Sequence, residues 1–183
     1  MPSIPLSLRY YRITYDDSIG NYRYLLSFES RNRNKGEEVV IVLMNPSKAG
    51  IYNGVEKVDP TVGKVLCWCE RQNYHTVHIL NLFPYRDPNP LQLTTLGFTT
   101  LIGNQARCNT RITDTCNNSS ISKVIVAWGD CDGILPNLVQ RRTNWLWGIL
   151  DINKVYHVGD KTENGNPRHG RMWNRNPQLN KWK

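Results

Sequence analysis

The stretch that decides the fold is Glu38-Val39-Val40-Ile41-Val42-Leu43-Met44-Asn45-Pro46-Ser47-Lys48-Ala49-Gly50. It contains six consecutive apolar residues, four of them β-branched, and no polar alternation. This pattern is typical of a strand that is buried on both faces, as the central strands of a parallel α/β sheet are. We therefore take residues 38–44 as the central strand and expect ligands to bind near its carboxyl end.

Asn45-Pro46-Ser47 stands at that carboxyl end. Pro46 cannot continue a β-ladder and restricts Asn45 to an extended or turn conformation, so the Asn amide is presented at a fixed angle above the sheet. An ordinary Asn-Pro turn is the alternative, because this dipeptide is common in turns.

The rest of the chain alternates apolar strands with segments that are compatible with helices. We expect parallel strands at residues 38–44, 76–81, 123–128 and 154–158, and helices at about 60–72, 103–116 and 133–150. Asp59-Pro60-Thr61 suits a helix start, with Asp59 as N-cap. Two aromatic-rich runs predict a β-hairpin within residues 1–35. The predicted fold is α/β, with three layers around a central four-stranded parallel sheet and the hairpin at one edge.

The length and composition suit a single soluble domain that spans residues 1–183. The hydrophobic fraction is 39%, and no apolar run approaches the roughly 18 residues of a membrane span. The N-terminus lacks a signal-peptide core, so we expect a cytoplasmic monomer without a membrane partner. The five cysteines include Cys67-x-Cys69 but no zinc or iron–sulfur spacing, and we expect neither a metal nor a cofactor.

The formal charge of +8 indicates a polyanionic partner. Positive charge gathers in residues 168–183, which we expect to form a basic C-terminal tail without any acidic residue. The cations of this segment are Arg168, Arg171, Arg175, Lys181 and Lys183, with Trp173 and Trp182 between them. Basic residues mixed with aromatic ones suit a surface that grips phosphates and stacks on bases, although a solvated tail is the plainer alternative.

Four polar segments are expected to converge at the carboxyl ends of the strands. They are Asn45, Asn81, Trp128-Gly129-Asp130 and Asn166-Pro167-Arg168-His169. The chain has no nucleophile elbow and no Gly-rich phosphate loop. Amides are poor bases, but they can hold a water and read the edge of a nucleobase. This set suits cleavage of an N-glycosidic bond, which needs a positioned water and a donor to the departing base.

These motifs, in the order Met44-Asn45-Pro46-Ser47, Asn81-Leu82-Phe83, Ala127-Trp128-Gly129 and Pro167-Arg168-His169, carry a resemblance to a known family. The chain resembles an uncharacterised bacterial and phage family, domain of unknown function 1643, and through it the uracil-DNA glycosylase superfamily. The resemblance covers roughly residues 38–170. It implies the superfamily's fold and a DNA glycosylase that flips its target base.

The resemblance also implies the roles of individual residues. Asn45 positions the attacking water, Asn81 reads the flipped pyrimidine, and His169 donates a hydrogen bond to the leaving base. The base pocket is completed by Met44, Pro46, Ser47 and Phe83. From their positive charge, and not from the resemblance, we expect the following residues to bind DNA: Lys48, Arg86, Arg168, Arg171, Arg175, Lys181 and Lys183. Gly170 departs from the superfamily pattern, which has Pro after the His.

Ser47 is a second departure, because uracil-specific members carry a Tyr there that blocks C5 of the pyrimidine. We therefore expect a C5-modified pyrimidine as substrate, for example glucosylated hydroxymethylcytosine in phage DNA, and an antiviral role.

The sequence leaves two other functions open. One is a non-catalytic protein that binds nucleic acid or a nucleotide on the same fold, and the other is a small-molecule N-ribosyl hydrolase. Several residues also have plainer interpretations. Lys48 suits contact with phosphate better than a Schiff base, His157 suits the core, and Trp128 suits the core better than a stacking platform. His169 is an ordinary loop residue in the plainest interpretation.

Overall fold

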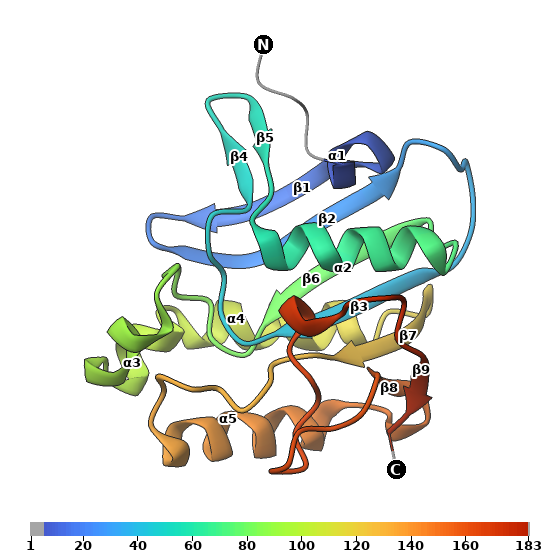
Figure 1. Ribbon diagram of the computed structural model, residues 1–183. Helices are drawn as coiled ribbons and strands as arrows, with labels where there is room; N and C mark the ends of the chain where they lie inside the picture. Colours follow the sequence, from blue (N-terminus) through green and yellow to red (C-terminus); the bar gives the residue numbers. More distant parts are fainter. Residues whose placement is uncertain (1–5, 183) are drawn as a thin grey trace.

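The computed structural model describes residues 6–182 and shows a mixed seven-stranded β-sheet with helices on both faces (Figure 1). The order across the sheet is β1 (Tyr11–Ile19), β2 (Tyr22–Ser30), β6 (Thr76–Asn81), β3 (Glu38–Leu43), β7 (Ile121–Val126), β8 (Val155–Val158) and β9 (Leu179–Lys181). A separate antiparallel ribbon joins β4 (Gly50–Tyr52) to β5 (Val55–Lys57).

The middle of the sheet is parallel, and its edges are antiparallel. Strands β6, β3, β7 and β8 run in one direction, so their carboxyl ends meet at one edge of the sheet. The β1–β2 hairpin pairs antiparallel with β6, and β9 pairs antiparallel with β8. The predicted α/β class is confirmed. The hairpin lies at one edge of the sheet, as predicted. The sheet is larger than predicted, because β9, for which no strand was expected, pairs with β8 at the other edge.

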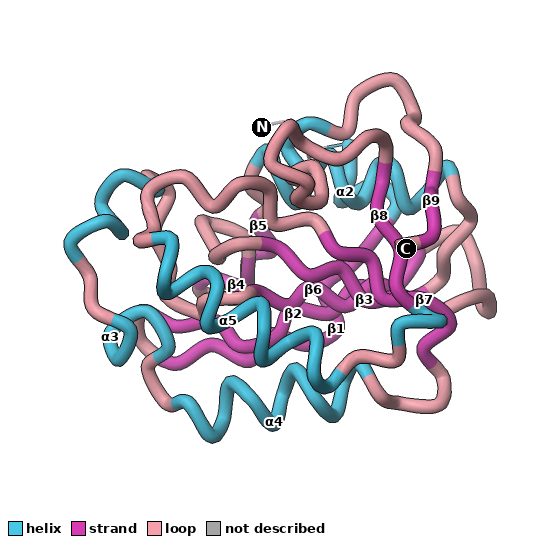
Figure 2. Tube along the Cα trace, turned by 90° about the horizontal axis from the view of Figure 1, so that it is seen from below, coloured by secondary structure: helices cyan, strands magenta, loops and turns pink. Residues whose placement is uncertain are grey.

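Helices cover both faces of the sheet, as Figure 2 shows from below. Helix α2 (Pro60–Arg71) lies on one face, and α4 (Gln105–Cys116) and α5 (Pro136–Ile149) lie on the other. The start of α2 follows the prediction: Asp59 Oδ1 accepts a hydrogen bond from Val62 N at 2.9 Å. The shorter elements are α1 (Leu6–Tyr10), α3 (Phe98–Ile102) and the 3₁₀ turns η1 (Pro90–Thr95), η2 (Ile152–Lys154) and η3 (Gly170–Met172).

The core forms two layers, one on each side of β3. Val39 and Ile41 point towards α2 and pack with Leu66. Val40 and Val42 point the other way and pack in the layer beneath α4 and α5. Burial on both faces is therefore the physical reason that this strand lacks polar alternation.

The prediction of a basic tail at residues 168–183 is wrong for residues 168–182, because these described residues are part of the folded domain. Trp173 is 2% exposed and packs edge-on against Trp68 of α2 at 5.0 Å between ring centroids. The indole N–H of Trp68 donates to the carbonyl of Pro177 at 2.9 Å. Trp182 stacks on Trp147 of α5 at 5.1 Å. Both tryptophans that were expected to face nucleic acid are packed against helices.

Two negative findings apply to residues 6–182. None of their helices is both long and apolar enough to cross a membrane. No group of three or more His, Cys, Asp or Glu side chains among them could hold a metal ion.

Candidate active site

A cleft of about 430 Å³ opens at the carboxyl end of β3. Five segments that are distant in the sequence contribute its lining. The polar members are Arg23, Asn45, Ser47, Lys48, Asp59, Thr61, Asp87, His169 and Arg171, and Met44 is among the apolar ones. Of the residues predicted for the site, the structure therefore brings together Asn45, His169, Met44, Ser47, Lys48 and Arg171.

Asn45 is held in one orientation by its own amide nitrogen. Nδ2 donates to the carbonyls of Pro46 at 3.2 Å, of Tyr85 at 3.5 Å and of Asp87 at 3.0 Å. Three carbonyl oxygens around one position select an NH₂ group and would repel a carboxylate, so Asn fits here better than Asp. With Nδ2 fixed in this way, Oδ1 is the acceptor that Asn45 offers to the cleft.

His169 is half-buried, and its tautomer follows from its contacts. Nδ1 accepts a hydrogen bond from the backbone N–H of Arg171 at 3.2 Å, so the neutral ring carries its proton on Nε2. Burial lowers the pKa of His169 and the charge of Arg171 lowers it further, while Asp59 opposes both. At neutral pH the ring is therefore an uncharged Nε2–H donor that lines the cleft.

The loop that carries His169 packs tightly against two neighbouring motifs. Gly129 has φ +73°, and a Cβ there would lie 3.0 Å from His169 Cβ. Gly129 N donates to the carbonyl of Pro167 at 2.9 Å. A Cβ at Gly170 would lie 2.8 Å from Val65 Cγ2. The Gly that replaces the expected Pro is thus required by the close approach of this loop to α2.

The motif around Asp130 holds the same loop from outside the cleft. Asp130 Oδ1 accepts hydrogen bonds from Thr162 Oγ1 at 2.6 Å and from Asn166 Nδ2 at 2.8 Å, and these bonds lower the pKa of Asp130. Trp128 is 2% exposed and belongs to the core layer under α5, which confirms its structural interpretation. Asp130 and Asn166 therefore position the His169 loop.

Two carboxylates in the cleft were not predicted as site residues. The sequence identifies Asp59 only as a helix cap, and it gives Asp87 no predicted role. Both line the cleft with Asn45 and His169. No local pattern could have identified them, because their proximity to Asn45 depends on where α2 and the β6 loop lie in the fold.

Three residues predicted to bind the base do not line the cleft. Phe83 is fully buried in the core layer under α5, and Pro46 is also buried. Asn81 pairs in register with Leu43 but is only 2% exposed, so the protein covers its amide. Neither Oδ1 nor Nδ2 of Asn81 has a hydrogen-bond partner among the described residues. The prediction of Asn81 at the cleft surface is wrong in this structure.

The predicted DNA-binding cations are dispersed. Arg86 is a structural residue, because its guanidinium donates to Ala49 O at 3.1 Å, Tyr52 Oη at 2.6 Å and Ser18 Oγ at 2.5 Å. Arg168 Nε donates to the carbonyl of Asp160 at 3.2 Å. Lys181 lies on the edge strand β9, three strands from β3.

Of the two other predicted cations, Arg175 lies on the neighbouring groove described next, and Lys183 lies outside the described residues.

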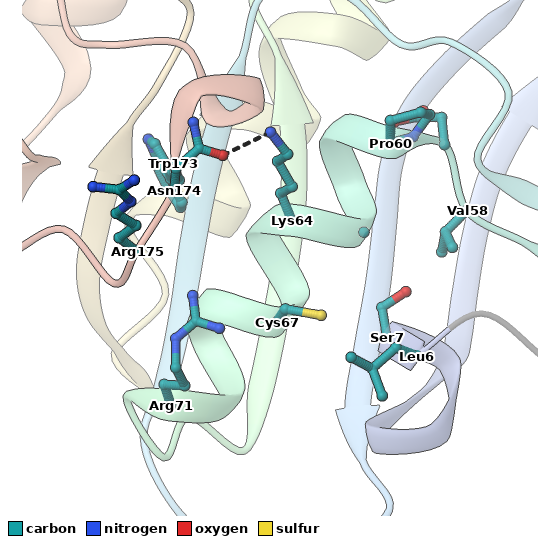
Figure 3. Close-up of a pocket in the computed structure, with 12 residues that line it drawn as sticks. Leu6, Ser7, Val58, Pro60, Lys64, Cys67, Arg71, Trp173, Asn174 and Arg175 are labelled. Atoms are coloured by element: carbon teal, nitrogen blue, oxygen red, sulfur yellow. Dashed lines mark hydrogen bonds between the residues drawn. The ribbon is translucent and has the colours of Figure 1, made fainter.

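A second, larger groove of about 600 Å³ runs along α2 (Figure 3). It shares Val58, Asp59 and Pro60 with the cleft, so the two hollows adjoin at the start of the helix. Its basic residues are Lys64, Arg71 and Arg175. Lys64 Nζ is anchored by the carbonyl of Arg171 and by Asn174 Oδ1, both at 2.8 Å. We call this surface the α2 groove.

These groups define a site in an α/β protein at the carboxyl ends of parallel strands, with a fixed acceptor, a neutral donor and two carboxylates. The chain matches the family model described as "Protein of unknown function (DUF1643)" over residues 23–170. It belongs to that family. No curated protein and no solved structure matches it.

Proposed function

We propose that the protein is a monofunctional DNA glycosylase of the uracil-DNA glycosylase superfamily. The observation that carries the proposal is the shared cleft of Asn45 and His169, which come from the end of β3 and from the loop after β8. One offers a fixed acceptor for a water, and the other offers a neutral donor for a departing base.

The proposed reaction adds one water across the N-glycosidic bond. As the C1′–N bond breaks, its electron pair leaves with the base, and the Nε2–H of His169 stabilises the negative charge. Water held by Asn45 Oδ1 adds its oxygen to C1′, and the proton it releases ends on the base. Asp59 and Asp87 supply negative charge near the oxocarbenium-like sugar, so no strong nucleophile is needed.

Ser47 and the α2 groove support the remainder of the proposal. The small Ser47 side chain lines the cleft and leaves room for a group on C5 of a pyrimidine. Lys64, Arg71 and Arg175 on the adjoining groove suit the backbone of the strand that carries the base. We propose excision of C5-modified pyrimidines, such as glucosylated hydroxymethylcytosine, from phage DNA, which leaves abasic sites as an antiviral defence.

The test is base release from defined DNA. Purified protein is incubated with matched duplex and single-stranded DNA that contains cytosine, uracil, hydroxymethylcytosine or glucosylated hydroxymethylcytosine, and alkali-labile abasic sites are counted. We expect cleavage only of DNA with the large C5 group, and a shift of preference towards smaller bases in Ser47→Tyr. Release of uracil alone would refute the substrate, and no release from any DNA would refute the glycosylase.

The cationic lining favours a second candidate, a protein that binds nucleic acid or a nucleotide without cleaving it. Lys48 and Arg171 border the cleft, and neither has a carboxylate within salt-bridge distance among the described residues. This candidate predicts binding without abasic sites, and the same incubation separates the two.

A further inference from the structure

Two arginines are buried among residues 6–182, and their guanidinium groups differ in how many hydrogen-bond partners they have. Arg142 is 2% exposed, and Arg23 is 1% exposed. Arg142 donates from Nε to Leu82 O at 2.7 Å, from Nη1 to Asn109 Oδ1 at 2.6 Å and from Nη2 to Cys108 Sγ at 3.1 Å. Every nitrogen of its guanidinium therefore has a partner.

Among the described residues, the Arg23 guanidinium makes only one such bond, from Nη1 to the carbonyl of Ala49 at 2.6 Å. Its Nε has no partner among the described residues, and no carboxylate of that part of the chain lies within salt-bridge distance. Burial lowers the pKa of Arg23 to about 10, which reflects the cost of keeping this charge away from water. One backbone bond does not account for a buried cation at this position.

Arg23 lines the cleft, beneath the loop that carries Ser47 and Lys48. Charged groups of both signs surround it. Arg86 adds positive charge, Asp16 and Asp59 act against it, and Asp87 lines the same cleft. Asp59 Oδ1 is occupied by the N–H of Val62. Three cations, Arg23, Lys48 and Arg171, thus border a cleft with two carboxylates, and the excess is positive.

We propose that Arg23, Lys48 and Arg171 form a phosphate-binding subsite in the cleft. Arg23 is the buried floor of this subsite, and the exposed Lys48 and Arg171 are its rim. A phosphate offers several acceptor oxygens and a negative charge, which match the unused donors of a guanidinium. The inference rests on the proposed function, because the subsite holds the phosphate of the nucleotide whose base is excised.

The phosphate can belong to a polynucleotide strand or to a free nucleotide. Binding of four probes to the full chain is measured by calorimetry: inorganic phosphate, thymidine, thymidine 5′-monophosphate and a short single-stranded oligonucleotide. We expect the monophosphate to bind about tenfold or more tightly than thymidine. An oligonucleotide that binds more tightly than the monophosphate indicates the strand, and the reverse order indicates a free nucleotide. Equal binding of thymidine and its monophosphate would overturn the subsite.

The variant that tests Arg23 is Arg23→Met, with Arg142→Met as the matched control. Both remove one buried guanidinium and retain an unbranched side chain. We expect Arg23→Met to weaken inorganic phosphate binding about tenfold or more, and Arg142→Met to lower the melting temperature while leaving that affinity unchanged. Wild-type phosphate affinity in Arg23→Met would overturn the proposal.

If Arg23→Met does not fold, the exposed rim provides the test. The double variant Lys48→Ala, Arg171→Ala should lose several-fold affinity for inorganic phosphate and show a shallower salt dependence. Unchanged affinity would overturn the subsite. Base release is measured separately: release without phosphate binding refutes the subsite alone, and phosphate binding without release refutes only the glycosylase.

Discussion

Polar side chains at the carboxyl end of β3 and those under α4 and α5 are satisfied to different degrees. In the second region, the carboxylate of Asp17 pairs with Arg107 and with Arg111 Nε at 2.6 Å, and Arg142 has a partner for each nitrogen. The exceptions there are Arg107 Nε and Trp128 Nε1, which have no hydrogen-bond partner among the described residues. In the first, among the described residues, the Arg23 guanidinium makes one hydrogen bond and the Asn81 side-chain amide makes none.

The contrast separates polar groups that hold the fold from polar groups with donors or acceptors to spare. A buried polar group without a partner costs about 1–3 kcal/mol, so a chain that keeps several at one edge of its sheet gives up stability there. The region under α4 and α5 is expected to respond to mutation through stability, and the cleft through ligand binding and rate.

The largest expected effect is the loss of base release in Asn45→Ala. Removing the acceptor that is proposed to hold the water should lower the rate by about 10²–10³-fold, while stability falls by only about 1 kcal/mol through the lost Nδ2 bonds. Rates come from single-turnover base release and stability from urea unfolding. Arg142→Met should show the opposite pattern, with near-normal turnover in the folded fraction. If the two variants lose rate and stability in the same ratio, the distinction between the regions fails.

The sequence predicts the main strands and helices well, because each of them depends on a local pattern of residues. The apolar run before Asn45 identifies a strand buried on both faces, and Asp59-Pro60 marks the start of α2 to the residue. Asn45 and His169 could be placed in one site because parallel strands end at a common edge. These inferences need only the pattern of a segment and the rules of parallel sheets.

The errors concern contacts between segments that are distant in the sequence. The sequence predicts that Arg86 is a loop cation that binds DNA. In the structure its guanidinium donates hydrogen bonds to β4 and to the β1–β2 hairpin, so its role is structural. The sequence predicts that Trp173 belongs to an exposed tail, but in the structure it is buried against a tryptophan of α2. Asn81 does stand at a strand end, but the depth at which the protein covers it is set by side chains from other elements. The residue composition of a segment cannot predict any of these contacts with distant segments.

An intermediate effect is expected at Gly170, where the cleft meets the core layer beneath α2. In Gly170→Ala the new methyl group would lie 2.8 Å from Val65 Cγ2 and 3.2 Å from Leu43 Cδ2. Overpacking of this kind costs about 1–3 kcal/mol, and the displaced loop should also move His169 and slow base release. Gly148→Ala in α5 is the control, because nothing lies within 4 Å of its Cβ and Ala favours a helix. Normal stability in Gly170→Ala would show that the loop is free to move.

The smallest expected effect is a pH dependence of stability, to which histidines of both regions contribute. Burial lowers the pKa of His169 in the cleft, and of His78 and His157 in the scaffold, below the ordinary value of 6.5. Below pH 6.5 the unfolded chain takes up protons before the folded one does. The stabilisation is therefore complete above pH 6.5 and is lost as the pH falls through the lowered values, by at most about 1.4 kcal/mol per pH unit for each histidine. The two aspartates with lowered pKa, Asp17 and Asp130, affect stability only below pH 3.8, so the histidines determine the pH dependence above that value.

Urea unfolding at pH 7.5 and 5.5 should show lower stability at the acid value. The loss should shrink in His78→Gln and in His169→Gln, but only His169→Gln should also slow the proposed base release, because His169 lines the cleft and His78 does not. Equal stability at the two pH values would contradict the buried, neutral state assigned to His169 and with it the donor that the proposed reaction requires.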